Sequence, residues 1–335
     1  GKALNLYLLT PEISLCCLAI VVILLDLFLK RKRLLAAVSV FGLVVPAAFS
    51  LALWGVEETS FAGMLVVDQF SLFFNLFFLV MAALVILSSV DYASKFRAFQ
   101  GEYYALVLLS AAGMMLMAST RELISIYIAL ELTAISLYAL TGFLKDPKSS
   151  EAGIKYLLLG AVASAVLLYG MALVFGIGGS THLQDIARAI PDGGLLANPA
   201  LSMGVVLLVA GFGFKIATVP FQMWVPDVYE GAPTPITAYL SVASKAAGFA
   251  VILRVFYEAL GPLSLDWGII FAILAAVTMT LGNVVAIAQT NIKRMLGYSS
   301  IAQAGYLMVG LATVTMLGRS GLVFFLAAYA LTNLG

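Results

Sequence analysis

The sequence predicts an all-α polytopic membrane protein with about 11 transmembrane helices. Of its 335 residues, 63% are hydrophobic and only 10% are charged, whereas soluble domains are about 45–50% apolar and about 25% charged. Apolar runs recur along the whole chain, and about 20 such residues let a helix cross a bilayer. The net charge of +1 argues against a nucleic-acid partner, so lipid is the expected environment.

Three spans are predicted in the first 100 residues, near 8–29, 34–54 and 69–90. The basic cluster KRKR at 30–33 separates the first two. Because this cluster follows the first apolar run, and because that run is too long, we do not interpret the segment as a cleavable signal. Eight further spans are predicted near 102–119, 121–143, 152–177, 200–224, 234–257, 267–288, 294–315 and 319–335. The last of them is expected to be truncated.

The basic residues predict the orientation of the chain. The connections that follow the odd-numbered spans, starting with 30–33, hold eleven of the 18 Lys and Arg residues. Because Lys and Arg accumulate in cytoplasmic connections, this side is placed in the cytoplasm and the N-terminus outside.

Residues able to hold a redox centre or a metal are scarce in the sequence. The two cysteines, Cys16 and Cys17, are adjacent, and the single histidine, His182, falls in a polar loop. Iron–sulfur clusters need about four thiolates, and membrane haems a buried axial ligand. We therefore expect no metal site, no redox catalytic residue and no cofactor in this chain.

Three ionisable residues lie inside apolar runs: Glu131, Lys215 and Lys245. A charge in the middle of a span costs about 3 kcal/mol on insertion scales, and such residues mark pathways for ions or protons. At 1.5 Å per residue, Glu131 lies roughly 15 Å and Lys215 roughly 22 Å from the outer ends of their spans. The sequence predicts a proton relay of these three residues, although a permanent Glu131–Lys215 structural pair stays open.

Pro220 predicts a break in the span that carries Lys215. Proline lacks an N–H and clashes with the carbonyl four residues earlier, which here belongs to Ile216. Broken helices recur at the ion sites of transporters, whereas a simple proline kink is the alternative. Gln303, Ser136 and Thr218 are candidate polar members of a water chain, although such residues more often bond to neighbouring backbone.

Three long segments resemble a known family. They are ALELTAISLYALTGFLKDPKSSEAGIKYLLLGAVASAVLLYG (129–170), KIATVPFQMWVPDVYEGAPTPITAYLSVASKAAGFAVILR (215–254) and QTNIKRMLGYSSIAQAGYLMVG (289–310). They are similar to the N subunits (subunit 2 in mitochondria) of respiratory complex I, NADH:quinone oxidoreductase, within the antiporter-like membrane subunit family. The run PDVYEGAPTP is typical of the N type.

The resemblance implies a fold of antiporter-like inverted five-helix repeats. Residues 1–100 then hold helices 1–3, residues 101–260 the first repeat with its broken helix 7, and residues 261–335 an incomplete second repeat. In the family, the glutamate and the two lysines at the positions of Glu131, Lys215 and Lys245 form the proton relay. Many members carry a histidine where this chain has Gln303, and a glutamine does not titrate near neutral pH.

The resemblance also implies an activity and partners. The expected function is that of a membrane-arm subunit of a proton-translocating complex I in the bacterial inner (plasma) membrane, beside the M subunit and the small K and J subunits. Flavin, iron–sulfur clusters and quinone are expected in partner subunits. Two alternatives remain: a subunit of a related multisubunit cation/proton antiporter, and a structural membrane subunit that does not pump.

Overall fold

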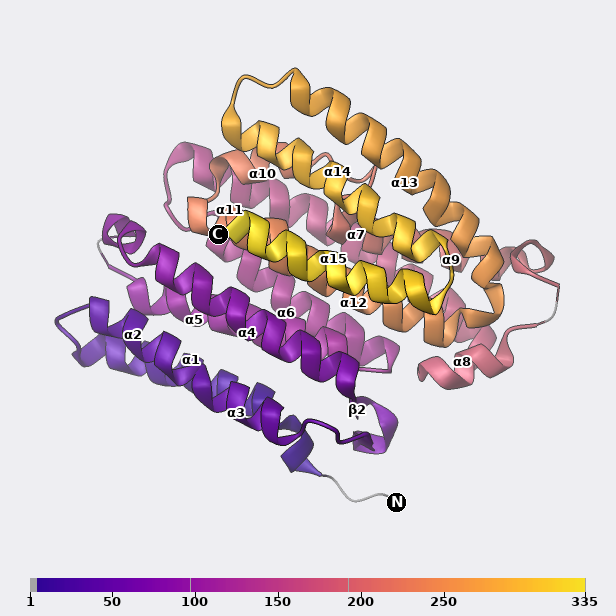
Figure 1. The fold of residues 1–335 in the computed structure, drawn as a ribbon, viewed down its shortest axis with the longest axis horizontal. Helices are drawn as coiled ribbons and strands as arrows, with labels where there is room; N and C mark the ends of the chain where they lie inside the picture. The colour runs from indigo at the N-terminus through magenta and orange to yellow at the C-terminus, as the bar shows by residue number, and fades with distance from the viewer. Residues whose placement is uncertain (1–4, 97, 192, 335) are drawn as a thin grey trace. The chain divides into compact units, whose positions relative to one another are not determined.

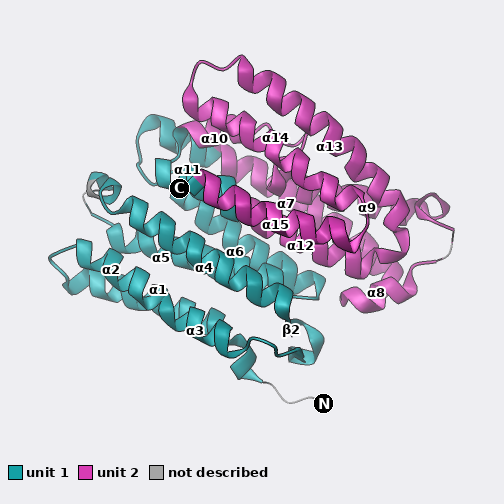
Figure 2. Cartoon of the chain, in the orientation of Figure 1, with its two compact units in different colours: residues 1–154, 231–243, 334 teal, residues 155–230, 244–333, 335 magenta. Residues whose placement is uncertain are grey.

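The predicted helical class is confirmed by a computed structural model, which describes residues 5–96, 98–191 and 193–334 (Figure 1). Among these residues, ten helices are long and apolar enough to cross a membrane. The chain forms two compact units. Unit 1 comprises residues 1–154, 231–243 and 334, and unit 2 comprises 155–230, 244–333 and 335 (Figure 2).

Unit 1 is built around a buried central helix. Its elements are a 3₁₀ turn (Leu6–Leu9), α1 (Thr10–Phe28), α2 (Arg33–Gly42), α3 (Val44–Ala52), β1 (Glu58–Ser60), a 3₁₀ turn (Phe61–Gly63), β2 (Leu65–Val67), α4 (Gln69–Ser89), a 3₁₀ turn (Tyr92–Phe96), α5 (Gln100–Ser119), α6 (Leu123–Thr141), the start of α7 (Pro147–Gly178) and α11 (Thr234–Tyr239). Helix α5 packs against α1, α4 and α6, and most of its residues are buried.

A short β-hairpin in unit 1 was not expected from the sequence. Strands β1 and β2 pair antiparallel, with Glu58 opposite Val67 and Ser60 opposite Leu65. They lie in the connection between α3 and α4. Because backbone groups outside a helix still need hydrogen-bond partners, this connection pairs with itself.

Unit 2 contains the broken helix. Its elements are most of α7, α8 (Leu183–Ala189), a 3₁₀ turn (Leu195–Ala197), α9 (Pro199–Ile216), α10 (Val225–Gly231), α12 (Lys245–Arg254), a π-helical segment (Val255–Ala259), a 3₁₀ turn (Gly261–Leu263), α13 (Ser264–Ile287), α14 (Ile292–Ala312) and α15 (Met316–Leu334). Helix α12 packs on α9, and α13 lies along α14 (Figure 1).

A second π-helical segment, Leu240–Ser244, directly precedes Lys245. The segments from Thr234 to Ala259 follow one another as one span of 26 residues. π-Helical turns are rare in proteins, but those that occur are often found at functional sites. This span therefore departs from regular α geometry just before a buried lysine.

Side chains cap the starts of several spans. Asp68 and Ser71 form a reciprocal capping box at α4, and the Glu122 carboxylate accepts from the Ser125 N–H at α6. Asn198 and Asn291 cap α9 and α14. Such caps satisfy N–H groups that the first helical turn leaves without partners, so these polar residues define where the spans begin.

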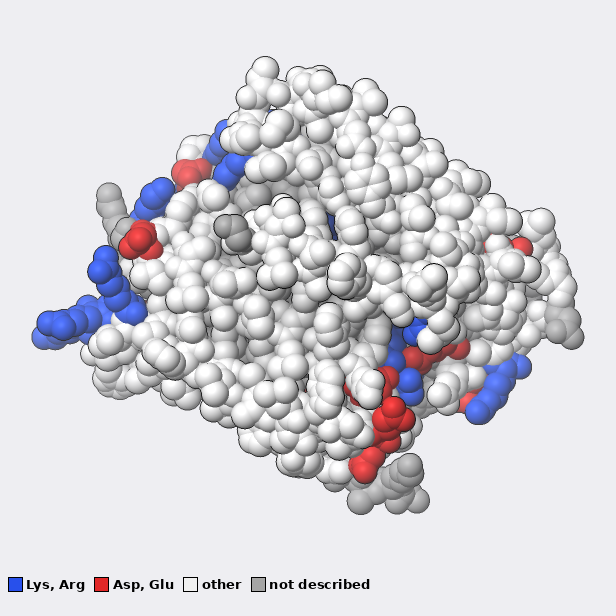
Figure 3. All heavy atoms as spheres, in the orientation of Figure 1, with Lys and Arg blue, Asp and Glu red and all other residues white. Residues whose placement is uncertain are grey.

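Two predicted spans differ from the structure. The span predicted at 200–224 is wrong at its end, because the helix stops at Ile216 and residues 217–224 are not helical. The span predicted at 294–315 is a helix, α14, but it is not among the ten apolar enough to cross a membrane by composition. Lys293, Arg294 and Gln303 lower its hydropathy. Charged side chains on the face shown in Figure 3 gather near helix ends, and the surface along the helices is mostly uncharged.

Candidate functional site

Lys215 lies in the last turn of α9, one residue before the helix ends. Only 7% of its surface is exposed. The helix ends because Ala217 adopts a left-handed conformation (φ 60°, ψ 40°), which reverses the chain direction. The Ala217 N–H then bonds to the Phe214 carbonyl at 3.2 Å, and the Thr218 N–H to the Gly213 carbonyl at 2.9 Å. These bonds satisfy carbonyls of the last turn and place the lysine at a closed helix end.

The non-helical segment that follows contains Pro220 and is bonded to α13. The Thr278 hydroxyl, on α13, accepts from the Val219 N–H at 3.0 Å and lies 2.9 Å from the Thr218 hydroxyl. Thr218 and Thr278 are both fully buried. Irregular backbone at membrane depth is tolerated only where protein buries it or water reaches it, and Thr278 provides such burial.

We predict that Thr278→Val loosens this segment. The substitution removes two hydrogen bonds, each worth about 1 kcal/mol, and leaves the Val219 N–H without its acceptor. Amide exchange of a peptide covering residues 217–224, measured by mass spectrometry on the intact complex, is expected to speed up. Thr280→Val is the matched control, because that hydroxyl bonds to the Ala276 carbonyl of its own helix. Equal exchange in both variants would contradict this account of the break.

Lys245 is the first residue of α12 and is 1% exposed. Its ammonium donates to the Ser300 carbonyl at 2.5 Å and to the Ser300 hydroxyl at 2.7 Å. Ser300 belongs to α14 and is itself buried. A buried ammonium therefore has two polar acceptors from one residue, which compensates part of its desolvation cost.

Helix α12 approaches α9 closely at Gly248, three residues after Lys245. A β-carbon at Gly248 would lie 2.7 Å from Ile216 Cγ2 and 3.7 Å from Lys215 Cβ. Residues three apart share a helix face, so Lys245 and Gly248 face the same side of α12. The missing side chain at Gly248 brings the α12 backbone against the end of α9.

Glu131 lies in unit 1, in the middle of α6, and is half-buried. It interacts electrostatically with Tyr127 and Tyr138 of the same helix. Ser136 donates to the Leu132 carbonyl at 2.9 Å, so its hydroxyl bonds to its own helix. The pairing of Glu131 with Lys215 and the place of Ser136 in a water chain stay predictions. Gln303 follows Ser300 by three residues on α14 and is also half-buried, and its role likewise stays a prediction.

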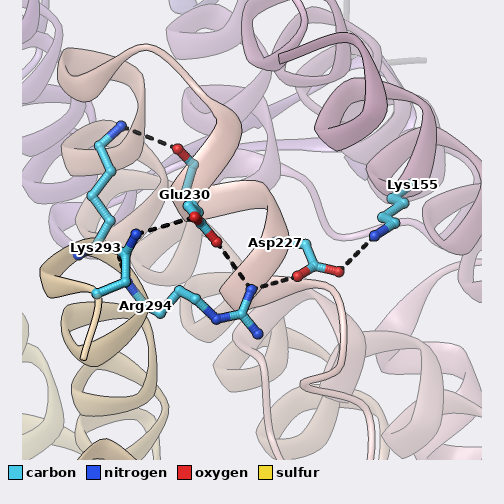
Figure 4. Close-up of polar contacts among 6 residues, drawn as sticks. Lys155, Asp227, Glu230, Lys293 and Arg294 are labelled. Carbon is cyan, nitrogen blue, oxygen red and sulfur yellow. Dashed lines mark hydrogen bonds and ion pairs between the residues drawn. The ribbon is translucent and has the colours of Figure 1, made fainter. Parts of the chain in front are cut away.

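An ionic cluster fixes α10, and the sequence analysis missed it. Asp227 contacts Lys155 of α7 at 2.8 Å and Arg294 of α14 at 2.6 Å, and Arg294 also contacts Glu230 at 3.1 Å (Figure 4). Lys155, Lys293 and Arg294 are among the eleven basic residues that predicted the orientation of the chain. The signal that could have identified their partners is the pair of carboxylates in PDVYEG, Asp227 and Glu230.

The two cations hold the pKa of Asp227 below its ordinary value, first through the hydrogen bond from Lys155 and then through that from Arg294. A carboxyl with a lowered native pKa binds its proton less readily when folded than when unfolded. Its stabilising contribution is therefore complete above the unfolded pKa and is lost as the pH falls through the lowered native pKa. The cluster is thus intact at neutral pH.

The arrangement supplies groups that can hold and release protons. Among the described residues, no group of three or more His, Cys, Asp or Glu side chains is placed to hold a metal ion. Lys215 and Lys245, in contrast, are buried amines, and burial favours the neutral form of an amine whereas a neighbouring anion favours the charged form.

Thr278 and Ser300 also contribute to this site, and the sequence did not identify them. Their only sequence signal is a polar side chain inside an otherwise apolar run.

Comparisons with known proteins agree on one family. Residues 120–335 match the family described as NADH:quinone oxidoreductase/Mrp antiporter, TM. The chain is 51% identical over 338 residues to NADH-quinone oxidoreductase subunit N of Dehalococcoides mccartyi, covering 97% of this chain and 70% of that relative. The chain thus spans about 70% of the relative's length.

Two solved structures share the fold. A chain of respiratory complex I from Thermus thermophilus with bound Aureothin is 35% identical, with a TM-score of 0.79 over 96% of this chain and 69% of that one. A chain of the Mrp complex from Dietzia sp. DQ12-45-1b is 27% identical, with a TM-score of 0.83 over 98% of this chain and 36% of that one.

Proposed function

Because the chain belongs to the subunit N family of NADH-quinone oxidoreductases, we propose that it carries protons across the membrane through Glu131, Lys215 and Lys245. The observation that supports this most is that two lysines of unit 2 are buried beside irregular backbone: Lys215 at the end of α9 and Lys245 after a π-helical turn. Charges at such depth mark ion or proton pathways. The proposal includes the inverted-repeat organisation, with residues 101–260 as the first repeat and 261–335 as part of the second.

In this proposal each residue has a separate task. Glu131 and Lys215 form a pair in which the carboxylate favours the protonated lysine, and loss of that pairing favours release of its proton. Lys245 exchanges protons with Lys215, and Ser300 holds its ammonium between transfers. Gln303 and Thr218 bind water along the route. No redox step occurs in this chain, so quinone reduction in other subunits supplies the energy.

The proposal extends to location and partners. The distribution of basic residues supports a cytoplasmic 30–33 side and an N-terminus outside the bacterial plasma membrane. The neighbours are the M subunit and the small K and J subunits, with flavin, iron–sulfur clusters and quinone in other subunits of the complex.

We predict that Glu131→Gln lowers the number of protons moved per electron in the complete complex, reconstituted into vesicles and driven by NADH and quinone. Glutamine keeps the size of the side chain but cannot bind or release a proton near neutral pH. Glu57→Gln is a suitable control, since Glu57 is exposed. If Glu131→Gln complexes keep the wild-type ratio, Glu131 has no part in the relay.

A second candidate function is that of a cation/proton antiporter subunit, which the likeness to the Mrp complex favours. The same buried lysines could serve either activity. Proton flux driven by a sodium gradient, in vesicles without NADH or quinone, would favour the antiporter. Flux that requires both redox substrates favours the complex I function.

A further inference from the structure

Helix α10 contacts the surroundings of both buried lysines. Trp224, directly before α10, donates from its indole N–H to the Phe214 carbonyl at 2.9 Å. Phe214 precedes Lys215, and its ring centre lies 5.8 Å from the Lys215 ammonium, within the reach of a cation–π interaction. Trp224 thus bonds to the residue that contacts Lys215.

The far end of α10 contacts the residue that holds Lys245. The Tyr229 and Ser300 hydroxyls lie 3.5 Å apart, and Ser300 accepts from the Lys245 ammonium. Tyr229 is 1% exposed, so its position is set by packing. A displacement of α10 therefore changes the polar contacts near both lysines.

The position of α10 is set from two sides. Asp227, in the middle of α10, accepts a hydrogen bond from Lys155 of α7 on one carboxylate oxygen and from Arg294 of α14 on the other (Figure 4). Tyr156, next to Lys155, stacks on Trp224 with ring centres 4.5 Å apart and planes 5° from parallel. On α14, Gly297 lies against Val225 and Tyr229. Neighbouring residues of α7 therefore fix α10 by charge and by stacking.

We propose that Asp227 is a positioning residue for Lys215 and Lys245, because its bridge between α7 and α14 holds Trp224 against Phe214 and Tyr229 against Ser300. The inference rests on the proposed relay function. Asp227 does not itself transfer the proton. It keeps α10 where the two lysines need it, and its carboxylate contacts both α7 and α14 in the cluster drawn in Figure 4.

The test is the proton-to-electron ratio of the complete, reconstituted complex carrying Asp227→Asn. We expect a lower ratio at wild-type subunit content, and a ratio restored toward wild type by Asp227→Glu, which keeps the charge. Asp185→Asn is the matched control, because Asp185 forms an exposed ion pair with Arg188 in the same unit. A wild-type ratio in Asp227→Asn complexes would overturn the inference.

A second comparison separates positioning from general stability. Trp224→Phe keeps the aromatic ring but removes the N–H donor to Phe214. If Asp227 acts through Trp224, a variant that combines Asp227→Asn with Trp224→Phe lowers the proton-to-electron ratio no further than the more impaired of the two single variants. Losses that multiply would overturn this route of action. If Asp227→Asn complexes do not assemble, Arg294→Lys is measured instead. Lysine keeps the charge but does not reproduce the contacts of Arg294 with both Asp227 and Glu230. A wild-type ratio in Arg294→Lys complexes would also overturn the inference.

The inference and the relay can fail separately. If Lys215→Ala lowers the ratio and Asp227→Asn does not, the relay stands and the positioning role falls. If Lys215→Ala leaves the ratio unchanged, the proposed relay itself falls.

Discussion

Lys215→Ala is expected to stop proton transfer through this chain while the complex still assembles. Removing a positioned proton-transfer group costs about 10²–10⁴-fold in rate, which would make transfer through this route undetectable. Any proton movement by other subunits continues. The measurement is proton uptake by vesicles that contain the complete complex, at a matched rate of NADH oxidation.

The structure explains why assembly should survive the change at Lys215. The end of α9 is closed by backbone bonds from Ala217 and Thr218 and by Trp224, none of which uses the lysine side chain. Lys215→Arg is the informative contrast, because it keeps a charge but an arginine is not deprotonated in proteins. Restored uptake in Lys215→Arg complexes would show that charge alone is needed, and would contradict proton transfer through Lys215.

Lys245→Met is expected to have an effect of similar size, for a different physical reason. Methionine keeps an unbranched side chain of similar length but offers no donor, so the Ser300 hydroxyl and carbonyl lose the ammonium that now lies within 2.7 Å. A hydrogen bond from a charged donor is worth about 1.5–3 kcal/mol, and the relay loses its second proton-binding group. We expect proton uptake to fall about as far as in Lys215→Ala.

The control for Lys245→Met is Lys30→Met, since Lys30 is exposed. Subunit content, measured on the purified complexes, separates a folding defect from a transfer defect. Wild-type uptake in assembled Lys245→Met complexes would remove Lys245 from the relay.

The broken helix shows how far the sequence could predict this site. The proline at 220 indicated a break, and the structure has a non-helical segment there, but α9 ends at Ile216, before the proline. The left-handed conformation of Ala217 has no sequence signal, because alanine is a strong helix former. Composition and span length predicted the class of fold well, because apolar runs of this length have few alternatives to a membrane helix.

Contacts between distant segments were less predictable. Ser300 lies 55 residues from Lys245, and Asp227 lies 72 residues from Lys155. Hydrophobic periodicity indicates which face of a helix is buried, but not which helix packs against it. For that reason the buried lysines could be recognised from sequence, whereas Ser300, Thr278 and Asp227 emerged only with the packing of α10, α13 and α14.

The most direct test of the relay is the proton-to-electron ratio measured for Glu131→Gln, Lys215→Ala and the combined variant in otherwise identical vesicles. When two residues act in one route, the effects of changing each of them are not additive. The relay predicts that both single variants lower the ratio by the contribution of this chain, and that the combined variant lowers it no further. A ratio that stays at the wild-type value in the single variants, or that falls again when both changes are combined, would contradict it.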